Sequence, residues 1–78
     1  MRDELRDYIV KHMIHDPKFA LRDDEPLITG GLVDSFSLVE LALFIEEKFG
    51  VHFPDSELTA DNMNTVTQIL NNITAKLK

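Results

Sequence analysis

The feature that most limits the fold of this chain is the absence of cysteine from a sequence of only 78 residues. A chain of this size buries only about 60% of the surface that its unfolded form exposes, so its core is marginal. Neither a disulfide nor a cysteine-based metal site can add stability. The core must come from aliphatic and aromatic side chains, and 44% of the residues are hydrophobic. We therefore expect one domain, residues 1–78, with little room for a deep catalytic pocket and a role carried out through partner proteins.

The first helix is expected over about residues 2–15, where apolar side chains recur with the helical period of 3.6 residues. Its apolar face consists of Leu5, Tyr8, Ile9 and Met13. Asp16 should end this helix, because a residue that precedes proline avoids the α region.

A long connection without sustained periodicity follows over residues 16–34 and contains two prolines and two glycines. Loops of this length are unusual inside a compact domain and often carry function. Its scattered apolar residues predict that the loop packs over the core.

The second helix is expected from Ser35 to Phe49, with Gly50 as its C-terminal stop. Its apolar stripe consists of Leu38, Leu41, Ala42, Ile45 and Phe49. Pro54 marks the next break, and residues 55–63 should form a turn or one short helix.

The last helix is expected to begin near Thr65, because threonine followed three residues later by Gln68 fits a capping box. Its apolar face consists of Val66, Ile69, Leu70, Ile73 and Leu77. The fold class is therefore all-α: an irregular bundle of three main helices plus one short helix, with a long loop between the first two.

Negative charge is concentrated in the middle of the chain. The net charge is −6, but residues 23–61 hold ten acidic side chains and only one basic side chain, Lys48. This distribution argues against nucleic-acid binding, which needs a basic patch, and suits docking to basic patches on proteins. No apolar run approaches the roughly 20 residues that span a bilayer, and the charged N-terminus is unlike a secretory signal, so we expect a cytoplasmic monomer.

The most informative stretch covers residues 31–41, which read GLVDSFSLVEL. Ser35 lies where a glycine-containing loop meets a helix N-terminus, with Asp34 beside it. Free N–H groups and the helix dipole make such a position favourable for a phosphate group. A phosphate ester on Ser35 would therefore be well placed.

This stretch resembles the attachment motif of acyl and peptidyl carrier proteins, in which Asp-Ser opens the second helix and Glu-Leu follows one turn later. The order of helices, loop and breaks agrees with that family over nearly the whole chain. The resemblance implies that a phosphopantetheinyl transferase joins 4′-phosphopantetheine to Ser35, and that the thiol of this arm holds acyl or aminoacyl groups as thioesters. Further partners would be an adenylating ligase, or acyltransferase and condensing enzymes.

The resemblance also implies roles for the neighbours of Ser35. Asp34 would assist modification by the transferase and its metal, and Gly31 would allow the tight approach into the helix. Partner enzymes would meet acids and apolar side chains along the second helix. These expected partner-binding residues are Phe36, Val39, Glu40, Leu43, Glu46 and Glu47.

Two departures from the fatty-acid type of carrier bear on the cargo. Phe36 follows the serine where leucine is usual, and the stretch between Pro54 and Thr65 is about two residues longer. In this region the chain is more similar to stand-alone bacterial D-alanyl and aminoacyl carriers. The cargo stays open between acyl and aminoacyl groups, with D-alanine for teichoic-acid-type modification as an alternative.

Several alternatives compete with these functional interpretations. Ser35 or Asp34 could simply cap the helix, Val39 and Leu43 could belong to the core, and the acids could be a solvated face. The whole chain could be an unmodified helical adaptor, while a hydrolase lacks the expected motif around its serine. The histidines at positions 12 and 15 have a spacing that can hold metal, but no cysteine accompanies them, so we expect no metal site.

Overall fold

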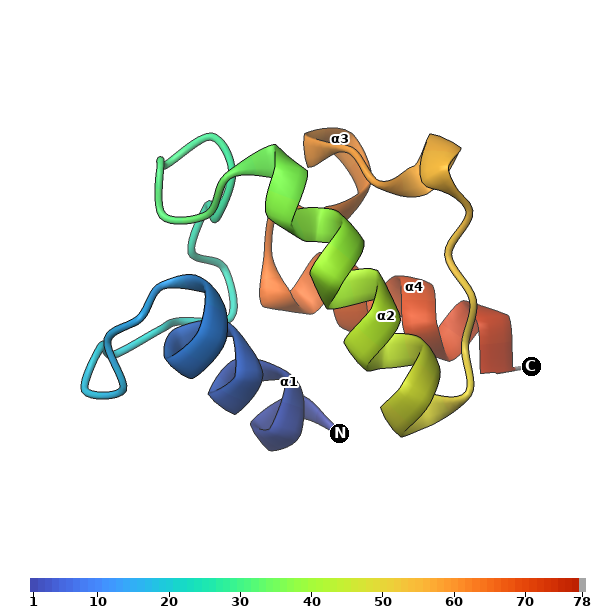
Figure 1. Cartoon of the computed structure of the whole chain (residues 1–78), viewed down its shortest axis with the longest axis horizontal. Coiled ribbons are helices and arrows are strands. Elements are labelled where there is room, and N and C mark those ends of the chain that lie inside the picture. The colour runs from blue at the N-terminus through green and yellow to red at the C-terminus, as the bar shows by residue number, and fades with distance from the viewer. Residues whose placement is uncertain (78) are drawn as a thin grey trace.

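The computed structural model describes residues 1–77, whose regular elements are all helical (Figure 1). In chain order they are α1 (Arg2–Tyr8), the π-helical turn η1 (Ile9–Met13), the 3₁₀ turn η2 (Ser35–Ser37), α2 (Leu38–Phe49), the 3₁₀ turn η3 (Asp55–Glu57), α3 (Ala60–Met63) and α4 (Val66–Leu77). The expected all-α bundle is confirmed. Within residues 1–77 no helix combines the length and the apolar character needed to cross a bilayer.

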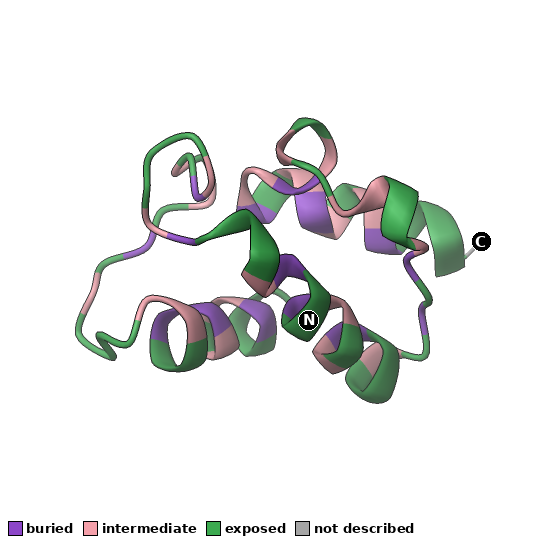
Figure 2. Cartoon of the chain, turned by 45° about the horizontal axis from the view of Figure 1, so that its top comes forward, coloured by how far each residue is buried: buried purple, intermediate pink, exposed green. Residues whose placement is uncertain are grey.

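The helices share one core, and the long loop contributes to it. α1 packs against α4, and α2 passes in front of α4 in the view of Figure 1. Figure 2 shows that the buried positions of each helix lie on its inner side. The loop adds Leu21, Leu27 and Val33, all buried, so the expectation that it packs over the core is confirmed. Burying such a side chain contributes roughly 1.5–3 kcal/mol, which a cysteine-free chain needs.

The first helix ends earlier than expected and in a different way. The helix widens into a π turn in which the N–H of Ile14 donates to the carbonyl of Ile9 at 2.8 Å. His15 then adopts a left-handed conformation with φ of 63°, and the N–H of Asp16 donates back to Val10 at 2.9 Å. The expected end at residue 15 is wrong by two residues, because this turn ends the helix before the proline acts.

The second and last helices largely follow the prediction. The second begins as the 3₁₀ turn η2 rather than as an α-helix, and Gly50 ends it with φ of 71° while its N–H donates to Glu46 at 3.0 Å. Residues 55–63 form two short elements, η3 and α3. Leu77, the last residue of the predicted apolar face, is 53% exposed at the end of α4.

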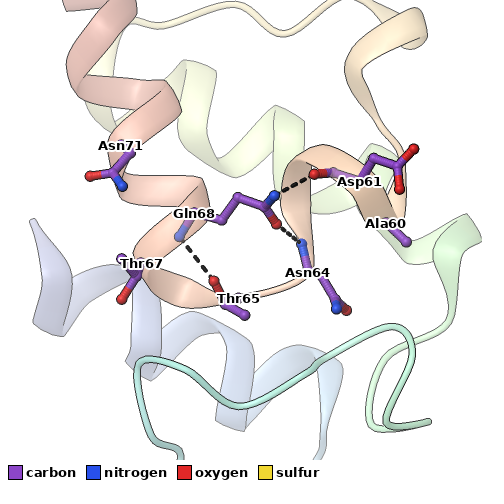
Figure 3. Close-up of a pocket in the computed structure, with 7 residues that line it drawn as sticks. All are labelled: Ala60, Asp61, Asn64, Thr65, Thr67, Gln68 and Asn71. Carbon is purple, nitrogen blue, oxygen red and sulfur yellow. Dashed lines mark hydrogen bonds between the residues drawn. The ribbon is translucent and has the colours of Figure 1, made fainter.

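The start of α4 carries only half of the expected capping box (Figure 3). The hydroxyl of Thr65 accepts from the N–H of Gln68 at 3.0 Å, as predicted. The Gln68 side chain instead accepts from the N–H of Asn64 at 2.7 Å and donates to the carbonyl of Asp61. Gln68 therefore joins the end of α3 to the first turn of α4.

Asn64 connects this junction to the long loop. Its backbone carbonyl accepts from the N–H of Leu27 at 2.7 Å. Its side-chain oxygen accepts from the N–H groups of Ile28 and Thr29 at 2.8 and 3.1 Å, and its amide nitrogen donates to the Thr29 hydroxyl at 3.0 Å. One residue thus satisfies several polar groups of a loop that has no regular structure of its own.

Asp23 holds an earlier part of the loop against two helices. Its carboxylate pairs with Arg6 at 2.6 Å and with Arg2 at 3.2 Å, both on α1. Its carbonyl accepts from the N–H of Thr67 at 3.1 Å, in the first turn of α4. The loop is therefore fixed at two places before it reaches residue 30.

We predict that Asn64→Ala lowers the free energy of unfolding by about 2 kcal/mol, because it removes three side-chain hydrogen bonds to the loop. Urea unfolding followed by helical circular dichroism measures the change. Asn71→Ala is the matched control, because Asn71 is exposed and its side chain makes no hydrogen bond within residues 1–77. Equal stabilities of the two variants would contradict the role given to Asn64.

Candidate functional site

Ser35 lies at the junction between the long loop and the second helix, with its side chain exposed. The residue before it, Asp34, is extended, and its carboxylate accepts from the N–H of Phe36 at 3.0 Å. The carbonyl of Asp34 accepts from the N–H of Ser37 at 2.9 Å. Asp34 is therefore the cap, and the alternative in which Ser35 is the cap is wrong. Within residues 1–77 the Ser35 hydroxyl forms no hydrogen bond, so it is available to react.

The turn before this junction is tight and needs its glycines. Gly31 has φ of 77°, which a residue with a side chain rarely adopts. A Cβ atom on Gly30 would lie 2.2 Å from the carbonyl oxygen of Pro26. Beyond the turn, Val33 is buried and its N–H donates to Leu27 at 2.9 Å. The expectation that Gly31 permits a tight approach into the helix agrees with this geometry.

Apolar side chains extend from Ser35 along the outer side of α2. Phe36 is 85% exposed, Val39 is 52% exposed and Leu43 is 55% exposed. The alternative that places Val39 and Leu43 in the core is therefore wrong. The core stripe of α2 is formed instead by Leu38, Leu41 and Ile45, which are fully covered.

Two shallow hollows lie on either side of Leu43. The first, of about 110 Å³, lies between α2 and the segment that follows it. It is lined by Val39, Ala42, Leu43, Glu46, His52, Phe53, Asp55 and Leu58. At its rim the carboxylate of Glu46 lies 2.7 Å from Nδ1 of His52. Three of the predicted partner-binding residues, Val39, Leu43 and Glu46, therefore share this hollow.

The second hollow, of about 280 Å³, lies between α2 and α1. It is lined by Tyr8, Glu40, Leu43, Phe44 and Glu47. The rings of Tyr8 and Phe44 are stacked, with centroids 4.1 Å apart and planes 15° apart. The sequence placed Tyr8 on the apolar face of the first helix, where it packs partly buried against the core, but did not identify Phe44. A signal for Phe44 was present, because it lies four residues after Glu40 and three before Glu47 on the same helical face.

The acids of this hollow act on the phenol of Tyr8. Burial raises the pKa of Tyr8 above its ordinary value of 10.0, and the negative charges of Glu40 and Glu47 raise it further. On its other side the Tyr8 ring lies 4.9 Å from the ring of His12. His12 therefore packs beside an aromatic ring, and within residues 1–77 no three metal-ligating side chains gather in one place.

Known proteins similar to this chain are carriers. No protein-family model matches the sequence. An acyl carrier protein of Campylobacter curvus is 34% identical over 71 residues, which cover 91% of this chain and 88% of that protein. The chain belongs to the acyl carrier protein family. An acyl carrier protein of Campylobacter hominis is 40% identical over 55 residues, or 70% of this chain and 68% of the relative. A D-alanyl carrier protein of Bacillus velezensis is 41% identical over 51 residues, or 65% of each chain.

Membership of this family confirms the main expectations drawn from the sequence. The chain is a carrier protein rather than an enzyme. Its covalently attached group is 4′-phosphopantetheine, and its partners include modifying enzymes such as transferases and ligases. The residues here fit this group in one respect that the structure shows: the serine hydroxyl beside Asp34 is exposed, forms no hydrogen bond within residues 1–77 and lies between a tight turn and a helix.

We predict that replacing Glu40 and Glu47 by glutamine lowers the pKa of Tyr8, because two negative charges that oppose phenolate formation are removed. Tyr8 is the single tyrosine and the chain has no tryptophan, so ultraviolet absorbance titrates this group alone. Because the folded-state pKa of Tyr8 is raised, its contribution to stability is complete below pH 10.0 and is lost as the pH rises through the folded-state value.

The matched control replaces Asp3 and Asp61, which are exposed and lie outside this hollow, by asparagine. This control changes the net charge by the same amount as the glutamine pair. An equal fall of the Tyr8 pKa in both variants would mean that overall charge, rather than the two nearby carboxylates, acts on the phenol.

Proposed function

We propose that Ser35 is the residue to which the phosphopantetheine arm is attached, and that the arm carries acyl or aminoacyl groups as thioesters between partner enzymes. The observation that carries this proposal is the Ser35 hydroxyl at the start of the second helix, which is exposed and forms no hydrogen bond to any described residue. When attached, the arm supplies the thiol that bonds to the cargo. The protein supplies a fixed point of attachment and a surface that partners bind.

The residues around Ser35 support this role in distinct ways. The dipole of the second helix is positive at its N-terminus, where it favours the negative phosphodiester. Asp34 keeps the first turn in place through one carboxylate oxygen, and we assign it a second role in modification by the transferase. Phe36, next to Ser35, is exposed, so a partner enzyme can contact this end of the second helix directly.

The exposed acids of α2 are proposed to guide partners to Ser35. Glu40, Glu46 and Glu47 are exposed, and they belong to a segment of the chain with a strong excess of negative charge. Basic patches on a transferase, an adenylating ligase, an acyltransferase or a condensing enzyme would complement this surface. Charge-guided docking gives fast association without tight binding, which suits a carrier that visits several enzymes in turn. We place this activity in the cytoplasm and in a monomer.

The size of the hollow beside Val39 favours a small cargo. Its volume of about 110 Å³ is smaller than the roughly 150 Å³ of an apolar cavity that holds one benzene molecule. A long fatty chain does not fit there without an opening of α2 away from the following segment. The similarity to D-alanyl carrier proteins points the same way. We therefore favour a short acyl or aminoacyl cargo, with D-alanine as the specific second candidate.

Incubation with a broad-specificity phosphopantetheinyl transferase and coenzyme A tests the attachment residue. Intact-mass spectrometry should show one added arm on the parent protein and on Ser37→Ala, and none on Ser35→Ala. Ser37 is a suitable control because it lies in the same short turn. An unmodified parent protein, with the transferase active on another carrier, would overturn the proposal.

Charge reversal tests the proposed guidance by α2. We expect Glu40→Lys combined with Glu47→Lys to slow loading by the transferase about tenfold at low ionic strength, and less in high salt, since exposed charges are screened. The control reverses Asp3 and Asp61, which are exposed and belong to α1 and α3. Equal rates for the parent and the α2 variant at low salt would contradict electrostatic docking. Circular dichroism verifies that both variants are folded.

A further inference from the structure

A polar hollow of about 490 Å³ lies where α3 meets the first turns of α4 (Figure 3). We call it the α3–α4 hollow. Its volume falls within the range of roughly 300–1,000 Å³ that is typical of ligand sites. Apart from one alanine, its lining side chains are polar: Asp61, Asn64, Thr65, Thr67, Gln68 and Asn71.

The segment that forms this hollow carries almost no charge. From residue 60 to residue 75 the only charged side chain is that of Asp61, in a chain of which 28% is charged. The other polar side chains are amides and hydroxyls, which both donate and accept hydrogen bonds. The hollow therefore suits a neutral ligand that has amide and hydroxyl groups of its own.

Two side chains of the hollow are free to bind such a ligand. The amide of Asn71 and the hydroxyl of Thr67 are exposed and form no hydrogen bond within residues 1–77. They lie four residues apart, so they are neighbours on the surface of α4. Gln68 and Asn64 are instead bonded to α3 and to the long loop. The hollow thus combines fixed polar groups with two groups that have no partner in the described chain.

We infer that the α3–α4 hollow holds the phosphopantetheine arm between visits to partner enzymes, through hydrogen bonds from Thr67 and Asn71 to the amides of the arm. The inference rests on the proposed attachment to Ser35 and adds a resting site on the carrier's own surface. Beyond its phosphate the arm is neutral and contains amide and hydroxyl groups. The phosphate stays at the start of the second helix, so only the neutral part reaches the hollow.

Two backbone hydrogen bonds limit the distance between Ser35 and the hollow. The N–H of Leu27 donates to the carbonyl of Asn64 at 2.7 Å, and the N–H of Val33 donates to the carbonyl of Leu27 at 2.9 Å. Backbones bonded in this way lie roughly 5 Å apart, and the two residues from Val33 to Ser35 span at most about 7 Å. Ser35 therefore lies at most about 17 Å from Asn64.

The arm is long enough to cover this distance. Its main chain has about as many atoms as five peptide residues, so it spans about 17 Å when extended. Figures 1 and 2 agree in placing α3 beside the first turn of the second helix. The arm consequently reaches the α3–α4 hollow without any movement of the helices.

Covalent attachment makes an open hollow sufficient as a binding site. Hydrogen bonds made there replace hydrogen bonds to water, so a free ligand gains little from them. A group on a short flexible linker has an effective concentration in the millimolar range. A site with a dissociation constant of about 1 mM then holds the arm for about half of the time. Such weak binding suits a carrier, because each partner must withdraw the arm quickly.

NMR spectroscopy of the protein with and without its arm tests the inference, after intact-mass spectrometry has verified attachment. We expect the ¹⁵N–¹H signals of Thr67 and Gln68 and the side-chain amide signal of Asn71 to shift on attachment. Nuclear Overhauser contacts from the unlabelled arm to the labelled protein should fall on the same residues. Changes confined to α2 and the neighbours of Ser35 would overturn the inference.

Matched double variants measure the contribution of the two free side chains. Thr67→Ala with Asn71→Ala should reduce the shift of the Gln68 signal at least about threefold, because loss of one ordinary hydrogen bond changes an equilibrium roughly fivefold. Ser56→Ala with Thr74→Ala removes two exposed hydroxyls outside the hollow and should change the shift less than about twofold. Equal reductions in the two variants would contradict the inference. Circular dichroism verifies that both are folded.

A second kind of arm separates this inference from the proposed function. The chain has no cysteine, so Ser35→Cys offers a single thiol. An iodoacetyl derivative of pantothenamide, which is neutral and has the same amide and hydroxyl groups, alkylates this thiol with loss of iodide. Shifts at Thr67 and Asn71 in the conjugate would support the hollow even if the transferase left Ser35 unmodified. Their absence would overturn the hollow and leave the attachment proposal intact.

Discussion

The hydrogen bonds of Asn64 hold the loop at residues 27–29 against the start of α4, and the position of Ser35 depends on them. Beyond these residues the chain makes one tight turn, buries Val33 and arrives at Asp34. A loop of this length has many conformations when it is free, and ordering it costs conformational entropy. The polar contacts of Asn64 and the burial of Leu27 offset that cost together. Ser35 consequently has a defined position relative to the helices, although most of the chain before it is irregular.

The polar contacts of Asp23 likewise hold the long loop in place in a chain without cysteine. Asp23 is bonded to α1 through its carboxylate and to α4 through its carbonyl, so a single residue connects three segments. These ion pairs are partly exposed, and each is worth at most about 1 kcal/mol. Their value lies in specifying where the loop runs, while buried apolar side chains supply most of the stability. Polar contacts thus select one arrangement among several that would bury similar surface.

The parts of the fold that were predictable are those governed by short-range patterns. Gly50, the apolar stripe of α2 and the threonine cap of α4 are local signals, and the structure bears them out. The place of Ser35 at the junction of loop and helix was also predicted, whereas the choice of Asp34 as the cap came from the structure. The π turn after α1 and the partners of Gln68 are formed by local hydrogen bonds, but no residue pattern specifies a π turn, and the capping pattern predicted another partner for the Gln68 side chain. Tyr8 lies on the apolar face of α1, as predicted, because it packs partly buried against the core, and its ring stacks on Phe44.

Leu43 separates two hollows on the surface of α2. It lines the hollow toward the segment after α2 and also the hollow toward α1, so it forms the ridge between them. The first hollow has its acid engaged by a histidine, and the second has two acids without partners in the described chain. The proposed function therefore allows two partners to approach Ser35 from different sides and to be distinguished by their charge patterns. A carrier must bind several enzymes with one short helix, and a divided surface allows each contact to be weak and still selective.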